Sequence, residues 1–110
     1  MIVKSIKAVH DHVVDNYNHP NISALVKYLV IEIDHESYRI INDNDEPILY
    51  PKELFTIVDD TIPEDWVHEK FDDGEYFLHP PEFKDYFFED YFDGDKNVKA
   101  IFKKYIAKIR

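Results

Sequence analysis

The segment from Asp59 to Asp95 restricts most strongly what this chain can fold into. Its 37 residues contain 14 of the chain's 23 carboxylates and only two cations, Lys70 and Lys84, so its formal charge is −12. The same segment contains ten of the seventeen aromatic residues. An acidic segment without aromatic rings would stay solvated, whereas rings provide apolar surface to bury. We therefore expect a folded segment that presents an acidic surface.

Size and composition predict one small domain. The chain has 110 residues, close to the commonest domain size, and 45 % of them are hydrophobic. Because there is no cysteine, neither disulfides nor thiolate metal ligands can support the fold. No apolar run has the length of a signal peptide or of a membrane span. We expect a single domain over residues 1–110, located in the cytoplasm and outside the membrane.

The net charge of the whole chain bears on the kind of partner. A formal charge of −10 disfavours direct binding to nucleic acid or to an anionic membrane, because like charges oppose encounter. A basic protein is the favoured partner. Acidity also serves solubility alone, and this alternative stays open for the overall charge.

The first seventeen residues have the period of an amphipathic helix. Ile2, Ile6, Val9 and Val13 recur at spacings of four, three and four, which places them on one helical face. A break that contains proline, at residues 18–21, ends the pattern. The sequence therefore predicts an N-terminal helix, held by packing because its β-branched residues have weak helix propensity.

Three stretches predict an antiparallel β-meander: residues 27–34, 37–42 and 47–50. The first is rich in β-branched residues and is followed by a turn short enough for a hairpin. The second ends in Asn-Asp-Asn-Asp, a turn signal, and the third is a short edge strand. In the first strand, alternation places Leu29, Ile31 and Ile33 together on one face.

Residues 51–58 and the stretch after them carry two further signals. Residues 51–58 open with a proline and align apolar side chains, including Phe55, on one helical face, which predicts one or two helical turns. Asp-Gly at 73–74, between apolar flanks, is a strong turn signal. It predicts a second hairpin with strands at 66–71 and 75–78.

Two helices are predicted in the last third of the chain. Pro80-Pro81 can begin a helix whose apolar face carries Phe83, Tyr86, Phe87 and Tyr91, with Phe88 and Phe92 off that face. The last helix, with Asp95 as its N-cap, has the clearest period in the chain, formed by Val98, Ile101, Phe102, Tyr105, Ile106 and Ile109. The expected fold is α+β: an N-terminal helix, the meander plus the second hairpin, and a C-terminal amphipathic helix packed on the sheet.

No residue pattern indicates catalysis or a cofactor. The three serines lack a nucleophile-elbow sequence, and two glycines twenty residues apart cannot form a phosphate loop. The six histidines are read as turn or surface residues. Residues 43–46 and 90–95 lack the ligand spacing of an EF-hand loop. We expect no enzymatic activity, no cofactor and no metal site.

The acidic aromatic segment is the candidate binding surface. Tyrosine and tryptophan contribute strongly at the centre of protein interfaces, and surrounding carboxylates steer a cationic partner. The competing interpretation is that the rings are core, which we expect of the phenylalanines. The expected partner-binding residues are Asp65, Asp72, Asp73, Glu75, Tyr76, Asp85, Tyr86, Glu89, Asp90, Tyr91 and Asp93.

The chain resembles the immunity proteins of bacterial polymorphic-toxin and contact-dependent inhibition systems. The resemblance lies in small size, acidity, absence of cysteine and three patches, at residues 63–66, 73–76 and 87–95. It implies a cytosolic antitoxin that binds and blocks one cognate toxin domain, such as a nuclease; the acidic charge predicts that this domain is basic. We expect the chain to be a monomer or a weak dimer. The resemblance has no diagnostic motif, so it assigns no residue a role.

Two other functions stay open. In a DNA mimic, carboxylates would imitate phosphates and occupy a DNA-binding protein. Such a protein should show two rows of carboxylates over an elongated surface, whereas a toxin inhibitor should show one compact patch with tyrosines inside. The second alternative is a small metal-binding module that uses His68, His79 and Glu82.

Overall fold

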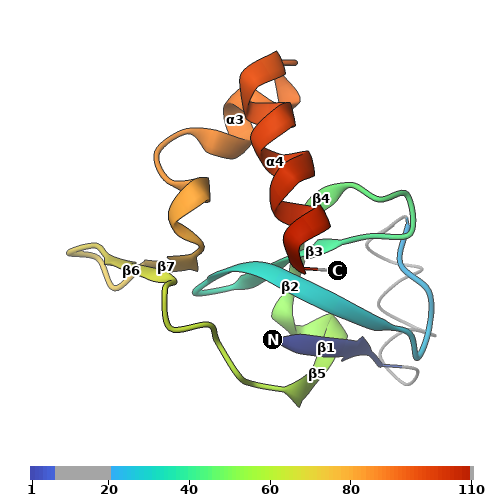
Figure 1. Cartoon of the computed structure of the whole chain (residues 1–110). Helices are drawn as coiled ribbons and strands as arrows, with labels where there is room; N and C mark the ends of the chain where they lie inside the picture. Colours follow the sequence, from blue (N-terminus) through green and yellow to red (C-terminus); the bar gives the residue numbers. More distant parts are fainter. Residues whose placement is uncertain (7–20, 110) are drawn as a thin grey trace.

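A computed structural model describes residues 1–6 and 21–109 and shows an α+β fold with a seven-stranded antiparallel sheet (Figure 1). The strands are β1 (Ile2–Ser5), β2 (Lys27–Asp34), β3 (Ser37–Ile41), β4 (Pro47–Pro51), β5 (Phe55–Asp59), β6 (Val67–Lys70) and β7 (Tyr76–His79). The helical elements are the 3-10 turns η2 (Lys52–Leu54) and η3 (Pro81–Phe83) and the α-helices α3 (Phe87–Phe92) and α4 (Lys96–Ile109). In the described ranges, no helix has the length and apolar character needed to cross a membrane.

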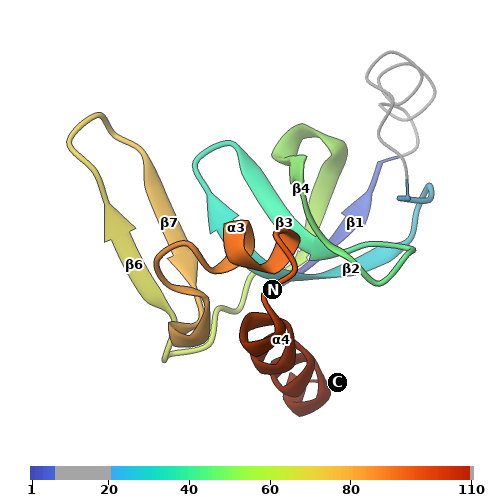
Figure 2. The same cartoon turned by 90° about the horizontal axis from the view of Figure 1, so that it is seen from above.

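Strand β2 is the centre of the sheet. The path of paired strands runs β4-β3-β2-β1-β5, and β7 also pairs with β2 and carries β6 on its other side. Strand β1 pairs with the beginning of β2, at Lys27 to Leu29, and β7 pairs with its end, at Ile33 and Asp34. The β6–β7 hairpin therefore continues the edge of β2 beyond β1 and extends away from the rest of the sheet (Figure 2).

The prediction of an N-terminal helix is wrong for Ile2–Ser5, which form β1. This strand lies between β2 and β5 and pairs antiparallel with both, so the sheet satisfies its backbone on two sides. Val3 and Ser5 point inward and are buried, as alternate residues of a strand do. Tertiary pairing overrides the local helical period here. The predicted helical residues from position 7 onward lie outside the described residues.

The predicted meander is confirmed, except that Ile33 lies on the other face of the sheet from the one predicted. In the β2–β3 turn, Oδ1 of Asp34 accepts hydrogen bonds from the backbone N–H groups of Glu36 and Ser37, at 2.8 and 2.6 Å. Val30 pairs with Ile40 but Glu32 pairs with Arg39, so β2 has one extra residue at this point. This β-bulge shifts the alternation. Ile33 consequently packs with Val30, on the opposite face from Ile31, against the prediction.

The helical prediction for residues 51–58 holds only for the single 3-10 turn of η2. Phe55 and the four residues after it form β5, which pairs with β1. Three of these residues, Thr56, Ile57 and Val58, are β-branched and favour extended backbone. The second predicted hairpin is confirmed to within one residue at each strand end, with Gly74 at a φ of 89° in its turn.

The predicted helix after Pro80 is interrupted. Residues Pro81–Phe83 form η3, but Asp85 has a φ of 61°, in the left-handed region, and α3 begins only at Phe87. This interruption rotates α3 relative to the preceding turn. Phe88 is therefore buried and Tyr86 is 74 % exposed, the reverse of the predicted facing.

The C-terminal helix is confirmed as α4. Oδ1 of Asp95 accepts hydrogen bonds from the N–H groups of Asn97 and Val98, at 2.9 and 3.0 Å, which is the predicted N-cap. Phe102 and Tyr105 are buried against α3, η3 and the sheet, in a cluster that also contains Ile31 and Ile41 of the sheet. Ile101, expected on the apolar face, is 44 % exposed.

Candidate functional site

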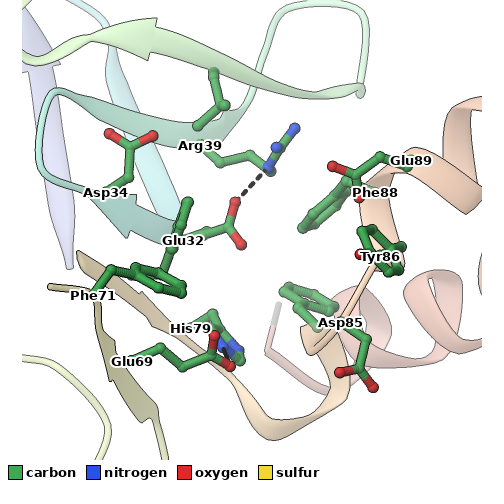
Figure 3. Close-up of a pocket in the computed structure, with 13 residues that line it drawn as sticks. Glu32, Asp34, Arg39, Glu69, Phe71, His79, Asp85, Tyr86, Phe88 and Glu89 are labelled. Carbon is green, nitrogen blue, oxygen red and sulfur yellow. Dashed lines mark hydrogen bonds and ion pairs between the residues drawn. The ribbon is translucent and has the colours of Figure 1, made fainter. Parts of the chain in front are cut away.

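A pocket of about 340 Å³ opens between the β6–β7 hairpin and the segment that leads into α3 (Figure 3). Its floor is formed by β2 and β3. Carboxylates and aromatic rings make up most of its wall. The lining residues are Glu32, Asp34, Arg39, Leu49, Glu69, Phe71, Phe77, His79, Phe83, Asp85, Tyr86, Phe88 and Glu89. We call this cavity the acidic pocket.

An ion pair between Glu32 and Arg39 forms the floor of the acidic pocket. The bulge at Ile31 turns Glu32 toward the helices, where Arg39 Nε donates to Glu32 Oε1 at 2.9 Å. The two side chains are only 9 % and 11 % exposed. The guanidinium also donates from Nη1 to the Pro47 carbonyl at 2.9 Å and lies 3.9 Å from the centre of the Phe88 ring. Arg39 is thus held by a carboxylate, a carbonyl and an aromatic face together.

The surroundings of the Glu32 carboxyl group change its pKa and leave one of its oxygens free. Burial raises the pKa of Glu32 above its ordinary value, and the charge and hydrogen bond of Arg39 offset this only in part. Only Oε1 is bonded to Arg39. In the described part of the chain Oε2 accepts no hydrogen bond, and it points into the pocket (Figure 3). The floor therefore offers a free acceptor on a buried acid.

His79, which is buried, and Glu69, which is partly exposed, form a second pair in the pocket wall. His79 is only 3 % exposed, and its Nδ1 lies 2.7 Å from the Pro80 carbonyl oxygen. A carbonyl oxygen can only accept, so Nδ1 must carry a proton. Nε2 then lies 3.0 Å from Oε1 of Glu69, a contact that needs one further proton on either partner. Both ring nitrogens of His79 are therefore engaged and are not free to bind a ligand.

The rim of the acidic pocket is aromatic and negatively charged. Phe71, from the β6–β7 turn, is 47 % exposed, and Tyr86, on the opposite wall, is the most exposed large apolar side chain among the described residues. Asp85 and Glu89 lie beside Tyr86 and are exposed. Exposed rings next to unpaired carboxylates suit a cationic group that also has apolar surface.

The structure places the predicted binding residues in more than one group. The eight carboxylates among them are all exposed. Asp85, Tyr86 and Glu89 line the acidic pocket. Asp72, Asp73 and Glu75 lie in or beside the β6–β7 turn, next to the pocket residue Phe71. Asp90 and Asp93 are on or just after α3, also exposed.

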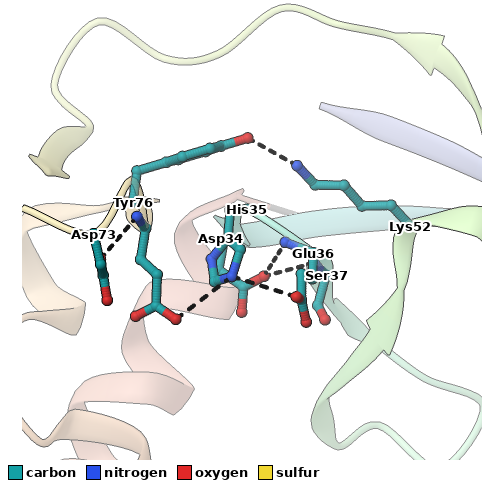
Figure 4. Close-up of polar contacts among 8 residues, drawn as sticks. Asp34, His35, Glu36, Ser37, Lys52, Asp73 and Tyr76 are labelled. Atoms are coloured by element: carbon teal, nitrogen blue, oxygen red, sulfur yellow. Dashed lines mark hydrogen bonds and ion pairs between the residues drawn. The ribbon is translucent and has the colours of Figure 1, made fainter. Parts of the chain in front are cut away.

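Tyr76 is half-buried, and its side chain belongs to a network of polar contacts within the molecule (Figure 4). Its hydroxyl accepts a hydrogen bond from Lys52 Nζ at 2.9 Å. The His35 ring packs edge-on against the Tyr76 ring, and His35 Nε2 lies 3.6 Å from carboxylate oxygens of both Glu36 and Glu75. These contacts join η2, the β2–β3 turn and the β6–β7 hairpin. They fix the hairpin that forms one wall of the acidic pocket.

Tyr91 and Asp65 lie apart from the pocket. The Tyr91 ring packs at 5.1 Å from the Phe102 ring, so it belongs to the helical core, and burial raises its pKa. Asp65 is exposed and precedes Trp66, which packs against the hydrophobic cluster that contains Val30 and Ile33. Of the three predicted tyrosines, only Tyr86 is exposed.

The residues of the metal alternative are not brought together. His79 is fully engaged, and His68 is exposed on β6, where its ring packs edge-on against Tyr76. Within residues 1–6 and 21–109, no group of three histidines or carboxylates has a geometry suited to a metal ion.

Sequence reasoning missed the floor of the pocket. Glu32 and Arg39 interrupt otherwise apolar strands, and a charged residue within a buried strand is a signal that it has a partner. The pairing of these two residues depends on the bulge, which has no sequence signature here. Phe71 and Phe77 were assigned to the core as phenylalanines, yet both line the pocket.

Comparison of the chain with protein-family models, with curated proteins and with solved structures found no significant match.

Proposed function

We propose that this protein is a non-catalytic immunity protein that neutralises a cognate basic toxin domain, such as a nuclease, by binding it through the surface around the acidic pocket. The observation that carries the proposal is the exposed, uncompensated charge on both walls of the pocket. The wall and turn residues Asp72, Glu89 and Asp90 form no ion pair or hydrogen bond through their side chains within the described ranges. Such charges are available to a partner.

The aromatic residues within this surface favour a protein partner. Phe71 and Tyr86 are exposed on opposite walls, where hydrophobic and cation–π contacts would add to ion pairs. A DNA mimic would instead need rows of carboxylates along an elongated face. The molecule measures 38 × 32 × 24 Å, and its pocket carboxylates are interrupted by rings. This arrangement fits a compact patch with a tyrosine inside it.

Charge would govern the speed of capture. A cytosolic antitoxin must bind its toxin before the toxin acts, and electrostatic steering raises association rates by about 10- to 1,000-fold. Exposed carboxylates of the β6–β7 turn and of α3, the elements that border the pocket on its two sides, would draw a basic surface toward it. The buried Glu32–Arg39 pair and the Tyr76 network would hold these walls in place.

The test is growth protection. The chain is co-expressed with the variable C-terminal domain of a large secreted protein encoded beside its own gene. We expect the cells to survive with this chain and to die with an unrelated immunity protein. Absence of such a neighbouring gene, or death in the presence of the folded chain, would contradict the proposal.

A further inference from the structure

We propose that the acidic pocket binds one arginine side chain of the protein partner. The inference rests on the proposed function only for the identity of the protein that supplies this arginine. The charge of the pocket, its aromatic rings and the free oxygen of Glu32 favour a guanidinium group as the occupant.

The pocket has an uncompensated negative charge. Its lining includes five carboxylates, which belong to Glu32, Asp34, Glu69, Asp85 and Glu89. The cation is Arg39, and the contact between His79 and Glu69 holds one further proton, so the formal charge of the lining is −3. Charges that face one another in a partly enclosed cavity are screened less than charges on an open surface. A cation entering the pocket would relieve this repulsion.

The rings of the pocket select a planar cation. Five aromatic residues line it, from the β6–β7 hairpin on one side and from the η3–α3 segment on the other: Phe71, Phe77, Phe83, Tyr86 and Phe88. A guanidinium group is planar and weakly hydrated and stacks on aromatic faces, whereas an ammonium group is compact and strongly hydrated. Entry into an aromatic pocket therefore costs arginine less desolvation than lysine.

In this protein, a carboxylate and an aromatic ring already bind one guanidinium group, that of Arg39. The Arg39 guanidinium lies 3.9 Å from the centre of the Phe88 ring while Nε bonds to Oε1 of Glu32. Oε2 of Glu32, on the same buried carboxyl group, has no hydrogen bond from any described residue and points into the cavity. A second guanidinium could donate to this oxygen and reach the rim carboxylates of Asp85 and Glu89. This oxygen opens onto the cavity, so a donor that enters can bond to it without displacing the Arg39 contact.

The size of the cavity suits a single side chain. A volume of about 340 Å³ lies at the lower end of the range of roughly 300–1,000 Å³ found for ligand pockets. Metal ions are disfavoured as occupants, because no three histidine or carboxylate groups converge suitably in the part of the chain that is described.

The experiment is a nuclear magnetic resonance titration of the isotope-labelled chain with blocked arginine, Nα-acetyl-arginine methylamide. Blocked citrulline, which has the same shape without the charge, and blocked lysine are the comparison probes. We expect saturable shift changes at the amides of Glu32, His79 and residues 85–89 with blocked arginine. We expect much weaker binding with lysine and none with citrulline.

Matched variants locate the site. Asp85→Asn combined with Glu89→Gln should weaken the binding of blocked arginine by roughly three- to ten-fold. Asparagine tolerates the left-handed backbone of position 85, so this variant should keep its fold. Tyr86→Leu should weaken binding by about two- to five-fold. Asp60→Asn combined with Glu64→Gln changes the net charge equally at exposed positions outside the pocket and should leave binding nearly unchanged.

Three results would overturn the inference: shift changes scattered over all exposed carboxylates, equal binding of lysine and arginine, or equal weakening by the pocket and control pairs. Because no toxin is present in the titration, these results leave the growth-protection test untouched. Conversely, arginine binding in the pocket without growth protection would refute the proposed function and retain this inference.

Discussion

The buried Glu32–Arg39 pair determines how the pocket floor responds to pH. Burial already raises the pKa of Glu32 above 4.5, and removal of Arg39 would raise it further. A carboxyl group whose pKa is raised on folding stabilises the folded state less as pH rises above its unfolded value. In acid the group is neutral and needs no counter-charge. Arg39 is therefore most important to stability near neutral pH.

The variant Arg39→Met tests how much Arg39 contributes to stability at each pH. We expect it to lower the free energy of unfolding by about 3–5 kcal/mol near pH 7, because it leaves an unpaired buried carboxylate. The loss relative to the original protein should shrink as the pH falls toward 4.5. Urea unfolding at several pH values measures the loss of stability near pH 7 and its decrease in acid. The double variant Glu32→Met with Arg39→Met should recover much of the stability, and an equal loss for the single variant at every pH would contradict the account.

Tyr105 provides a second residue with a distinct titration. Burial, with a smaller contribution from the charge of Glu82, raises the pKa of Tyr105 to about 12, against an ordinary value of 10.0. The protonated phenol is therefore favoured by folding, and its contribution to stability is complete below pH 10 and lost as the pH rises toward 12. Tyr105→Phe should remove a tyrosinate absorbance step near pH 12. Tyr86→Phe is the control and should leave that step in place.

At the scale of elements, the turns and the helix that depend on neighbouring residues could be predicted from sequence. The β2–β3 turn is fixed by Asp34, the β6–β7 turn by Gly74, and α4 by its period and its Asp95 cap, and all three were predicted from sequence. Strands β1 and β5 were predicted as helical because their partners are distant in sequence. Strand pairing across 50 residues supplies hydrogen bonds that a local window does not contain.

The candidate site was predictable to the same extent. The composition of residues 59–95 predicts the acidic and aromatic character of the pocket wall, and the exposure of its carboxylates follows from their charge. The floor was not predictable, because the bulge at Ile31 decides which face Glu32 occupies. The left-handed backbone of Asp85 likewise decides that Tyr86, rather than Phe88, is exposed.

The cap of α4 gives a prediction at this scale. Asp95→Ala removes the hydrogen bonds to the N–H groups of Asn97 and Val98 and should lower the free energy of unfolding by about 1 kcal/mol. Asp93→Ala is the matched control, since in the described structure the Asp93 side chain makes no hydrogen bond. Urea unfolding at neutral pH should separate the two variants. Equal losses would mean that the cap does not stabilise α4.

At the scale of the whole molecule, the sheet and the two helices hold two acidic walls around one pocket. The β6–β7 hairpin forms one wall and is tied to the rest of the sheet through Lys52 and Tyr76. The other wall, formed by the η3–α3 segment, is anchored by Phe83, Phe87 and Phe88 in the helical core. This arrangement leaves the carboxylates outward and the phenylalanines mostly inward. It would allow steering and docking of a basic protein without a large change of shape.

The most direct measurement is the rate of association with the proposed partner, the variable C-terminal domain of a large secreted protein encoded beside the gene, at several salt concentrations. The test variant replaces Asp72, Glu89 and Asp90 with their amides, and the control variant replaces Glu53, Asp60 and Glu64, which are equally exposed. We expect the test variant to associate about ten-fold more slowly at low salt, with the difference fading as salt rises. The control should stay close to the original protein. Equal rates for the test and control variants at every salt concentration would contradict the claim that the walls of the acidic pocket capture the partner.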